Sequence, residues 1–394
     1  MMTLLVVSGT VALAWTALAL RLFFLSRSRW FRFLGPPGWS NASLPRVDAV
    51  IPARNEEEHI AATVEALRRQ DYPALTITVV DDESTDATAA ILDRLASRDA
   101  QGVSLRFIRG VPRPSGWVGK TWAVHQGVAG TTAGWIWFVD ADMGLHPEAL
   151  RAAVVEGEAT GADLVSFLPG VQCRTFWQGT IASAFLQLLG QLYPLDRVND
   201  PGCPEAIAAG GFLLVRRVAY ESAGGHAAVR NAIVEDIELA RRVKADGRKL
   251  LVRLAPALAW THMYGSFGQI WAGLRKNAYA GMDFKLHKFA TGAIIALLLA
   301  WSPWIALIAG MVRGQPAAVS VGLWGIMAQG FASAPILVFL QLPVPFAFTL
   351  PAGITAYVAI ATSSVWHYHR GRILWKGRSL SASVSRGTPP SGME

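Results

Sequence analysis

The stretch that decides the fold is Trp135-Ile-Trp-Phe-Val-Asp140-Ala-Asp142-Met143. It predicts a short buried strand that ends on two carboxylates, because continuous apolar runs of this length are typical of central parallel strands. Open α/β sheets bind ligands in the crevice at the carboxyl ends of their strands. Alternation along an extended chain would point Asp140 and Asp142 to one side, where two carboxylates and a diphosphate suit Mg²⁺ or Mn²⁺. The alternative is a strand followed by an ordinary aspartate cap on the next helix.

The composition indicates a membrane protein. Hydrophobic residues make up 52% of the 394 residues and charged residues only 16%, which is too apolar for a purely soluble enzyme. The net charge of +8 favours basic flanks of membrane segments and contact with anionic lipid. Nucleic acid is not an expected partner, since no nucleic-acid motif is present. The two cysteines form no metal-type cluster, so we expect reduced thiols in a domain that faces the cytosol.

Strand and helix patterns alternate from Val47 onward. This alternation predicts an α/β fold with a parallel, doubly wound sheet. The expected strands are 47–51, 75–80, 104–108, 135–139 and 164–167, and the expected helices are 56–70, one from 86, one after 120, and 233–245.

The flanking segments predict membrane attachment at both ends. The apolar run from Leu4 to Leu20 is followed rather than preceded by arginines, which favours a membrane anchor over a cleaved signal peptide. We therefore expect a multi-pass protein of a bacterial-type inner membrane with a cytoplasmic catalytic domain. The predicted parts are an anchor at 1–25, a linker at 26–46, a catalytic domain at 47–288, membrane segments at 289–368, and a basic, flexible tail at 369–394.

The number of spans near the C-terminus stays open at two to three. Apolar segments at about 290–312, 317–340 and 345–366 would place the tail outside, whereas Arg370, Arg372, Lys376 and Arg378 favour the inside. One segment could be re-entrant or interfacial, and the interruption at 330–335 is a candidate for it. Separately, the stretch 175–193 favours an interfacial helix or an acceptor-site wall over a buried core helix.

Short polar motifs follow the first two strands and precede two helices. Asn55 could cap the next helix, whereas Asp81 and Asp82 suggest hydrogen bonds to a base or ribose. Lys120 is expected to contact a diphosphate near a helix start, although Pro114 stands where a P-loop requires glycine. A solvated surface lysine is the alternative.

Two further motifs suggest the acceptor side. Glu235 and Asp236 lie near a helix start, where they could simply favour the helix dipole. Gly210-Gly211 needs a close backbone approach or a positive φ, compatible either with an acceptor cavity or with a plain turn.

Together these motifs resemble the family-2 inverting glycosyltransferases of the nucleotide-diphospho-sugar transferase (glycosyltransferase-A-like) fold. The resemblance runs from about Val47 to Met282, and several motifs are similar to hopene-associated and carotenoid glycosyltransferases. The family resemblance is carried by 51–56, 80–82, 84–86, 140–142 and 235–236. The likeness to hopene-associated enzymes is carried by 116–123, 198–201, 208–211, 216–217, 223–225, and 235–236 with 239–240 and 243–244. The likeness to carotenoid enzymes is carried by 263–264, Gly273, 276–277 and Gly281. Gln269-Ile-Trp-Ala lacks the Arg-Trp of a Gln-x-x-Arg-Trp motif, which disfavours a processive polymer synthase.

The resemblance implies that a sugar passes from a nucleotide sugar, expected to be a UDP-sugar, to a lipid hydroxyl or carboxyl group. It implies donor contacts, a metal ligand for Mg²⁺ or Mn²⁺, a catalytic base and an acceptor side. The donor contacts would be Pro52, Arg54, Asn55, Glu56, Asp81, Asp82, Lys120 and Asp140; the metal ligand Asp142; the base Asp236; and the acceptor side Gly210, Gly211, Glu235 and Trp271. The sugar, the lipid (such as a hopanoid or carotenoid) and the oligomeric state stay open. A polyprenyl-phosphate sugar transferase and an inactive membrane scaffold remain as alternatives.

Overall fold

The computed structural model describes residues 2–26, 33–35, 44–97, 103–261, 266–372, 374–375 and 378–379. The chain divides into two compact units. The first, here called the sheet unit, comprises Phe33–Gly170, Leu195–His262 and His367–Glu394. The second, here called the helical unit, comprises Met1–Arg32, Val171–Pro194 and Met263–Trp366. The predicted catalytic segment 47–288 is thus shared between the units, and the tail from 369 is grouped with the sheet.

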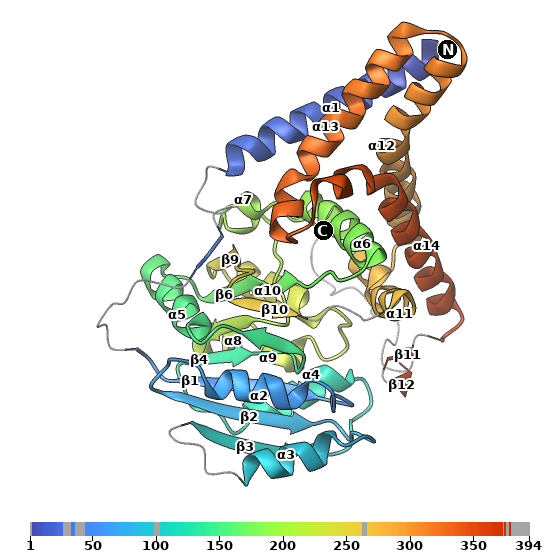
Figure 1. Cartoon of the computed structure of the whole chain (residues 1–394). Coiled ribbons are helices and arrows are strands. Elements are labelled where there is room, and N and C mark those ends of the chain that lie inside the picture. Colours follow the sequence, from blue (N-terminus) through green and yellow to red (C-terminus); the bar gives the residue numbers. More distant parts are fainter. Residues whose placement is uncertain are drawn as a thin grey trace. The chain divides into compact units, whose positions relative to one another are not determined.

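The sheet unit is built on a seven-stranded sheet in the order β3-β2-β1-β4-β8-β6-β9 (Figure 1). Neighbouring strands are parallel except for β8, which runs antiparallel to both β4 and β6. The predicted, mostly parallel sheet is therefore confirmed, and the reversed strand is an addition. The strands are β1 (Val47–Ala53), β2 (Leu75–Asp81), β3 (Ser104–Arg109), β4 (Trp135–Phe138), β6 (Leu164–Leu168), β8 (Leu213–Arg216) and β9 (Leu250–Leu254).

Helices of the sheet unit pack on this sheet, and a small second sheet has the order β5-β10-β7. Apolar side chains of β4, β8 and α10, among them Ile136, Leu213 and Leu239, form one buried cluster. The helices are α2 (Ile60–Arg68), α3 (Thr88–Ala96), α4 (Gly119–Val128), α5 (Ala149–Thr160), α7 (Leu195–Val198), α8 (Arg217–Ser222), α9 (Gly225–Ala228) and α10 (Glu235–Ala245); the short strands are β5 (Met143–Leu145), β7 (Gly170–Val171) and β10 (Ala259–Thr261).

Helix α2 begins later than the predicted residue 56. The backbone N–H of Glu56 donates to Thr88 Oγ1 at 2.8 Å, and its carbonyl accepts from Ile60 at 2.9 Å. Glu56 therefore lies in the turn before α2 and is not the first residue of that helix.

Three helices of the described residues are long and apolar enough to cross a membrane: α1 (Met2–Ser26), α12 (Leu286–Val312) and α13 (Pro316–Phe339). The predicted interruption at 330–335 is wrong, because α13 continues through Gly330 and Pro335. The third predicted C-terminal segment forms η2 (Val344–Phe348) and α14 (Leu350–His369), and α14 is not among the candidate spans. The unit also contains α6 (Phe176–Leu192), α11 (Phe267–Ala278) and η1 (Ala280–Met282).

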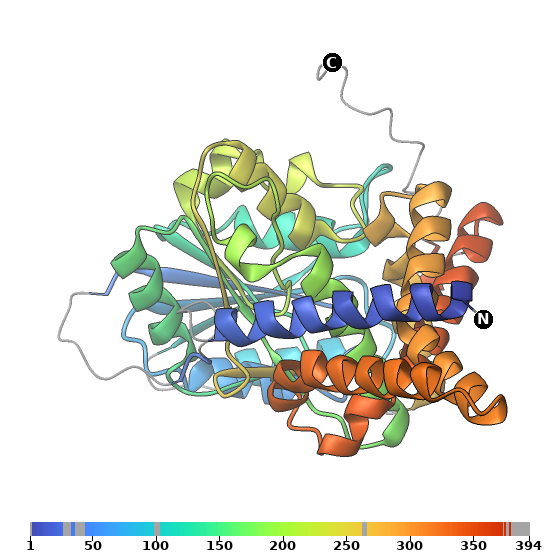
Figure 2. The same ribbon diagram turned by 90° about the horizontal axis from the view of Figure 1, so that it is seen from above.

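The candidate spans pack through a polar cluster and small residues. Pro303 has no N–H, so the carbonyl of Leu299 in the turn before it lacks its helical partner. Trp15 Nε1 donates to that carbonyl at 2.9 Å and Gln329 Nε2 at 3.3 Å, so α1, α12 and α13 meet there. Backbone groups in a bilayer must be satisfied internally, which explains these polar side chains. Figure 2 shows α1 lying along α13.

Glycine permits the close contact between α12 and α13. A Cβ at Gly322 would lie 2.5 Å from the backbone nitrogen of Leu307, and one at Gly310 would lie 2.7 Å from that of Val319. Small residues at such positions are typical of helix pairs in membranes.

Helix α6 is more deeply packed than the prediction of an interfacial helix implied. Its residues 178–184 are buried, and a Cβ at Gly179 would lie 2.6 Å from the ring of Phe346. Only its ends are open: Phe176 is 53% exposed and Leu192 64%. Its first turn is fixed by Thr175, whose hydroxyl accepts from Gln178 while the Gln178 side chain accepts from the Thr175 backbone.

Candidate functional site

Asp140 and Asp142 lie in the turn that joins β4 to β5. The strand stops at Phe138, so the argument from alternation along an extended strand is wrong. The two carboxylates nevertheless interact: burial and then the charge of Asp140 raise the pKa of Asp142. Helix α5 begins after Glu148 and has no side-chain cap. The interpretation of these aspartates as ordinary helix caps is therefore excluded.

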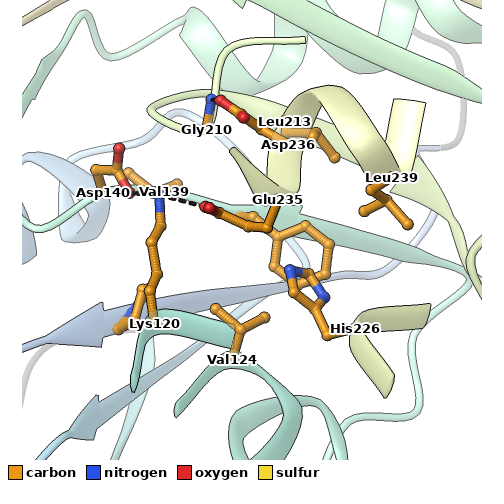
Figure 3. A pocket seen from close by; sticks show the side chains of 12 residues that line it. Lys120, Val124, Val139, Asp140, Gly210, Leu213, His226, Glu235, Asp236 and Leu239 are labelled. Carbon is orange, nitrogen blue, oxygen red and sulfur yellow. Dashed lines mark hydrogen bonds and ion pairs between the residues drawn. The ribbon is translucent and has the colours of Figure 1, made fainter. Parts of the chain in front are cut away.

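Lys120, on the first turn of α4, joins this turn to α10 (Figure 3). Its Nζ lies 2.7 Å from Asp140 Oδ1 and 2.7 Å from Glu235 Oε1. Burial alone would lower the pKa of Lys120, but Asp140, Glu235 and Asp236 together hold that pKa well above its usual value. Lys120 is therefore a charged bridge between two elements, and the alternative of a solvated surface lysine is wrong.

The adjacent carboxylates of Glu235 and Asp236 have different partners. Glu235 is bound to Lys120, and its side chain is 8% exposed. Asp236 Oδ2 accepts from the N–H of Gly210 at 2.8 Å, and its Oδ1 accepts from the N–H of Ile237 at 2.8 Å. Burial and then the charge of Glu235 raise the pKa of Asp236 to about 6, although Lys120 and both N–H groups oppose that rise. A general base works best when its pKa lies near the operating pH, and the pKa of about 6 for Asp236 meets this condition.

Close approach explains both glycines of the predicted acceptor motif. A Cβ at Gly210 would lie 2.9 Å from Lys120 Nζ and 3.2 Å from Asp236 Oδ2. A Cβ at Gly211 would lie 2.7 Å from Met143 Sδ. Side chains at these positions would displace the charged groups or the turn beneath them.

Asn55 joins the loops after β1 and β2. Its N–H donates to Ser84 Oγ at 3.0 Å, and its Oδ1 accepts from the N–H of Thr85 at 2.8 Å. It has a φ of 49°, in the left-handed region where asparagine is enriched. Helix α2 has no side-chain cap, so the capping interpretation of Asn55 is wrong.

Asp81 and Asp82 end β2 in the same loop pair, and both are buried. Asp81 Oδ1 accepts from the N–H of Ser84 at 3.3 Å. Arg54 Nη1 donates to the carbonyl of Glu83 at 2.8 Å and also to that of Asp82. The two strand ends are therefore tied together before any ligand binds.

A pocket collects six of the predicted site residues. The pocket is lined by Pro52, by the charged groups described above, and by apolar side chains from β4, β8, α4 and α10. It is lined by Pro52, Lys120, Val124, Phe138, Val139, Asp140, Gly210, Leu213, His226, Glu235, Asp236 and Leu239. Predicted residues outside that lining are Arg54, Asn55, Glu56, Asp81, Asp82, Asp142 and Gly211 in adjoining loops of the sheet unit, and Trp271 in the helical unit.

The sequence did not predict two residues of the site, one in the pocket and one beside Asp82. His226 lines the pocket, and its Nδ1 lies 2.9 Å from Tyr220 Oη. Burial, with the charges of Lys120 and His125, lowers the pKa of His226 to about 3, so it is a neutral wall of the site. Arg378, assigned by sequence to a flexible tail, contacts Asp82. A single histidine or arginine in such sequence contexts carries no distinguishing signal.

The surroundings of Asp142 fit a divalent cation. Its side chain is half-buried, its carboxylate repels that of Asp140, and its contact with Thr261 Oγ1 is long at 3.4 Å. A cation would relieve that repulsion. No cluster of three His, Cys, Asp or Glu side chains suited to a metal occurs in the part of the chain that the structure describes. Mg²⁺ commonly takes one or two carboxylates and completes its shell with substrate phosphates, so this donor set suffices.

Part of the chain is similar to a known protein family. Residues 48–224 match the sequence profile of "Glycosyl transferase family 2". The match includes Asp81, Asp82, Asp140 and Asp142 and ends before the predicted base.

Two curated relatives extend this likeness beyond the profile. The chain is similar to the 4,4'-diaponeurosporenoate glycosyltransferase of Staphylococcus aureus strain USA300, with 26% identity over 252 residues. That match covers 63% of this chain and 64% of the relative. The namesake of strain MRSA252 is 29% identical over 193 residues, which cover 48% of this chain and 49% of that relative.

A solved structure shows the same fold. A mannosyltransferase from Pyrobaculum calidifontis, in complex with GDP-Man and Mn²⁺, superposes with a TM-score of 0.53 and 18% identity. The superposition covers 92% of this chain and 99% of the mannosyltransferase. The predicted glycosyltransferase-A-like fold, with its mostly parallel sheet and apolar helices, is thereby confirmed.

Proposed function

We propose that this chain is a membrane-bound, inverting glycosyltransferase that moves a sugar from a nucleotide sugar to a terpenoid-type lipid. One observation carries the proposal: within a family-2 glycosyltransferase domain, Lys120 brings Asp140 at the end of β4 within a few ångströms of the carboxylates that open α10. Donor and acceptor groups must meet at such a place for direct transfer to occur.

The donor would lie over the ends of β1, β2 and β4. Asp81 or Asp82 would hold the base and ribose, with Asp140 on the ribose, because β2 and β4 flank β1 and their carboxyl ends lie at the same edge of the sheet. Lys120, which is cationic and close to Asp140, would meet the diphosphate. Asp142 would bind Mg²⁺ or Mn²⁺, which neutralises charge on a nucleoside diphosphate leaving group.

Asp236 would act as the general base. Its pKa of about 6 keeps it ionised at neutral pH yet basic enough to accept a proton from an attacking hydroxyl. Attack at the anomeric carbon from the face opposite the leaving group inverts the configuration in a single step. Such a displacement needs no enzyme nucleophile. Glu235, neutralised by Lys120, would position the cation instead of taking the proton.

An acceptor in the membrane is supported by the helical unit. Besides the candidate spans, it carries a row of aromatic side chains that are in part exposed: Phe176 53%, Trp177 43% and Phe267 42%. Their rings are 5.4 to 5.6 Å apart along the row, which continues to Trp271 at 5.9 Å from Phe267. Amphipathic rings of this kind are enriched where protein meets the bilayer surface. The names of the curated relatives suggest a carotenoid acid as one acceptor class.

The proposed topology places the sheet unit in the cytoplasm. Arg21 at the end of α1 and Lys285 before α12 would lie inside by the positive-inside rule, against Arg313 alone in the turn between α12 and α13. Two C-terminal spans return the chain to the side it left. The contact of Arg378 with Asp82 supports this return, since tail and sheet must then share one side of the membrane.

The proposal is tested by incubating the purified chain with radiolabelled UDP- or GDP-sugars, Mg²⁺ or Mn²⁺, and lipids from bacterial membranes. Label in a neutral or carboxyl-ester glycolipid supports it. Label only in a polyprenyl phosphate would establish the alternative transferase. If the chain is folded and no lipid becomes labelled with any of the donors, the result favours the inactive scaffold.

A further inference from the structure

The end of the described chain returns to the donor end of the sheet. After α14, the two-residue strands β11 (Leu374–Trp375) and β12 (Arg378–Ser379) pair antiparallel. Arg378 Nη1 lies 2.9 Å from Asp82 Oδ1 and 2.8 Å from Asp82 Oδ2, and Nη2 donates to Glu83. These contacts join residues 295 and 296 positions apart, and both ends belong to the sheet unit.

The guanidinium contacts both oxygens of the nearly buried Asp82 carboxylate. The Asp82 side chain is 5% exposed, whereas Arg378 itself is 21% exposed. On another side stands Gly119, where a Cβ would lie 2.6 Å from Asp82 Oδ2 and 3.4 Å from Arg378 Nη1. Burial raises the pKa of Asp82, and the hydrogen bond and charge of Arg378 counter that rise. In this arrangement, a nucleoside cannot reach the carboxylate while Arg378 stays in place.

A neighbouring cation, Arg54, opposes this contact. Arg54 donates to the carbonyl of Glu83, and burial and then the charge of Arg378 lower the pKa of Arg54. The two guanidinium groups therefore repel each other, and Arg378 is held by Asp82 and Glu83 against that repulsion. A ligand that hydrogen-bonds to Asp82 would remove a main attraction for Arg378.

We propose that Arg378 is a residue of the donor site: it occupies Asp82 in the empty enzyme and yields this carboxylate to the nucleoside of the donor. The Arg378 side chain thereby covers the nucleoside end of the site and withdraws when the donor binds. The inference rests on the proposed function, because it takes Asp82 as a nucleoside ligand. It assigns a donor-site role to a segment outside the family-2 match.

The test compares Arg378→Ala with Arg372→Ala, which removes the same charge from an exposed side chain of the tail. Binding of the free nucleoside, uridine or guanosine according to the donor that supports transfer, is measured by equilibrium dialysis on the full-length chain in detergent. Because a nucleoside has no phosphate, general attraction of anions by Arg378 does not contribute. Competition for Asp82 predicts that Arg378→Ala binds the nucleoside at least about threefold more tightly, whereas Arg372→Ala binds it like the wild type. Arg378→Lys should fall between them, since lysine offers a point charge without the planar guanidinium fork.

Hydrogen–deuterium exchange supplies a second readout on the unmodified protein. Saturating nucleoside diphosphate should speed amide exchange in the peptide that contains 374–379. Unchanged or weaker nucleoside binding by Arg378→Ala would overturn the proposal. Slower amide exchange in this peptide with nucleotide bound would also overturn it. If the wild type transfers sugar in either case, only this inference fails; if it neither transfers sugar nor binds nucleotide, the proposed function fails as well.

Discussion

Replacing Asp236 with asparagine separates base catalysis from the helix-terminal role of the side chain. The amide keeps the size of the carboxylate, and its oxygen can still accept a hydrogen bond from the N–H of Gly210. It cannot accept the proton of an attacking hydroxyl. We expect Asp236→Asn to fold and to bind nucleotide, while transfer to a hydroxyl acceptor falls at least about a hundredfold. That loss corresponds to about 2.7 kcal/mol on the barrier, more than the about 0.3–1 kcal/mol of a charge at a helix terminus.

The pH dependence gives this prediction a magnitude. Only ionised Asp236 can act as the base, so activity should fall as the pH drops through the pKa of about 6. From pH 7 to pH 5 the ionised fraction drops from about nine-tenths to about one-tenth, so kcat should fall about ninefold to tenfold. A carboxyl at the ordinary value of 3.8 would lose less than about a tenth of its activity over that range.

The assay is initial-rate transfer at saturating donor, with pH profiles of kcat for the wild type and three variants. Glu235→Gln should be milder than Asp236→Asn, because Glu235 is bound to Lys120 and its charge raises the pKa of Asp236. Glu238→Gln is the matched control, since Glu238 pairs with Arg241 on the same helix and does not line the pocket. Near-native turnover in Asp236→Asn, or its loss in Glu235→Gln alone, would refute the assignment.

Four further predictions concern the cation bridge, the metal, the acceptor and the topology. Lys120→Met should shift the acidic limb of the pH profile of kcat to higher pH, because Lys120 is one of the groups that lower the pKa of Asp236. An unshifted limb would show that Lys120 does not affect the pKa of the base. Asp142→Asn should abolish stimulation by Mg²⁺ or Mn²⁺, and full wild-type activity in excess chelator would contradict the metal site. A carboxylate acceptor arrives ionised, so Asp236→Asn should slow transfer to a carotenoid acid much less than transfer to a hopanoid hydroxyl; equal losses would argue against proton removal. Cysteines introduced at the exposed positions Glu58 and Arg372 should both resist an impermeant maleimide in intact cells, and labelling of either would overturn the proposed topology.

The elements that hold the donor end could be predicted because their signals are local. β1, β2 and β4 have continuous apolar runs, and each is followed by polar residues, so the edge where their carboxyl ends meet follows from parallel pairing. β8 was missed because Leu213–Arg216 is only four residues long and follows a glycine pair typical of a turn. β8 lies antiparallel between β4 and β6 because of tertiary packing, which no local sequence pattern indicates.

The motifs predicted residues that meet in one pocket, but not how those residues contact one another. Asp140 and Glu235 were both proposed, yet nothing in the sequence says that Lys120 joins them, since that bridge depends on how α4 and α10 pack on the sheet. The different partners of Glu235 and Asp236 follow from the same packing. Arg378 looked like one basic residue among several in a polar tail, and only the folded chain brings it to Asp82.

The stereochemistry of the product tests the central claim most directly. The purified chain is given an α-linked nucleotide sugar and the lipid that it glycosylates. The anomeric configuration of the initial glycolipid is read by NMR from the one-bond carbon–proton coupling constant at its anomeric carbon. Direct displacement with Asp236 as the base predicts a β-glycoside as the sole initial product, formed at least about a hundredfold more slowly by Asp236→Asn when the acceptor is a hydroxyl. An α-glycoside as the initial product would contradict the single displacement and, with it, the roles assigned to the pocket.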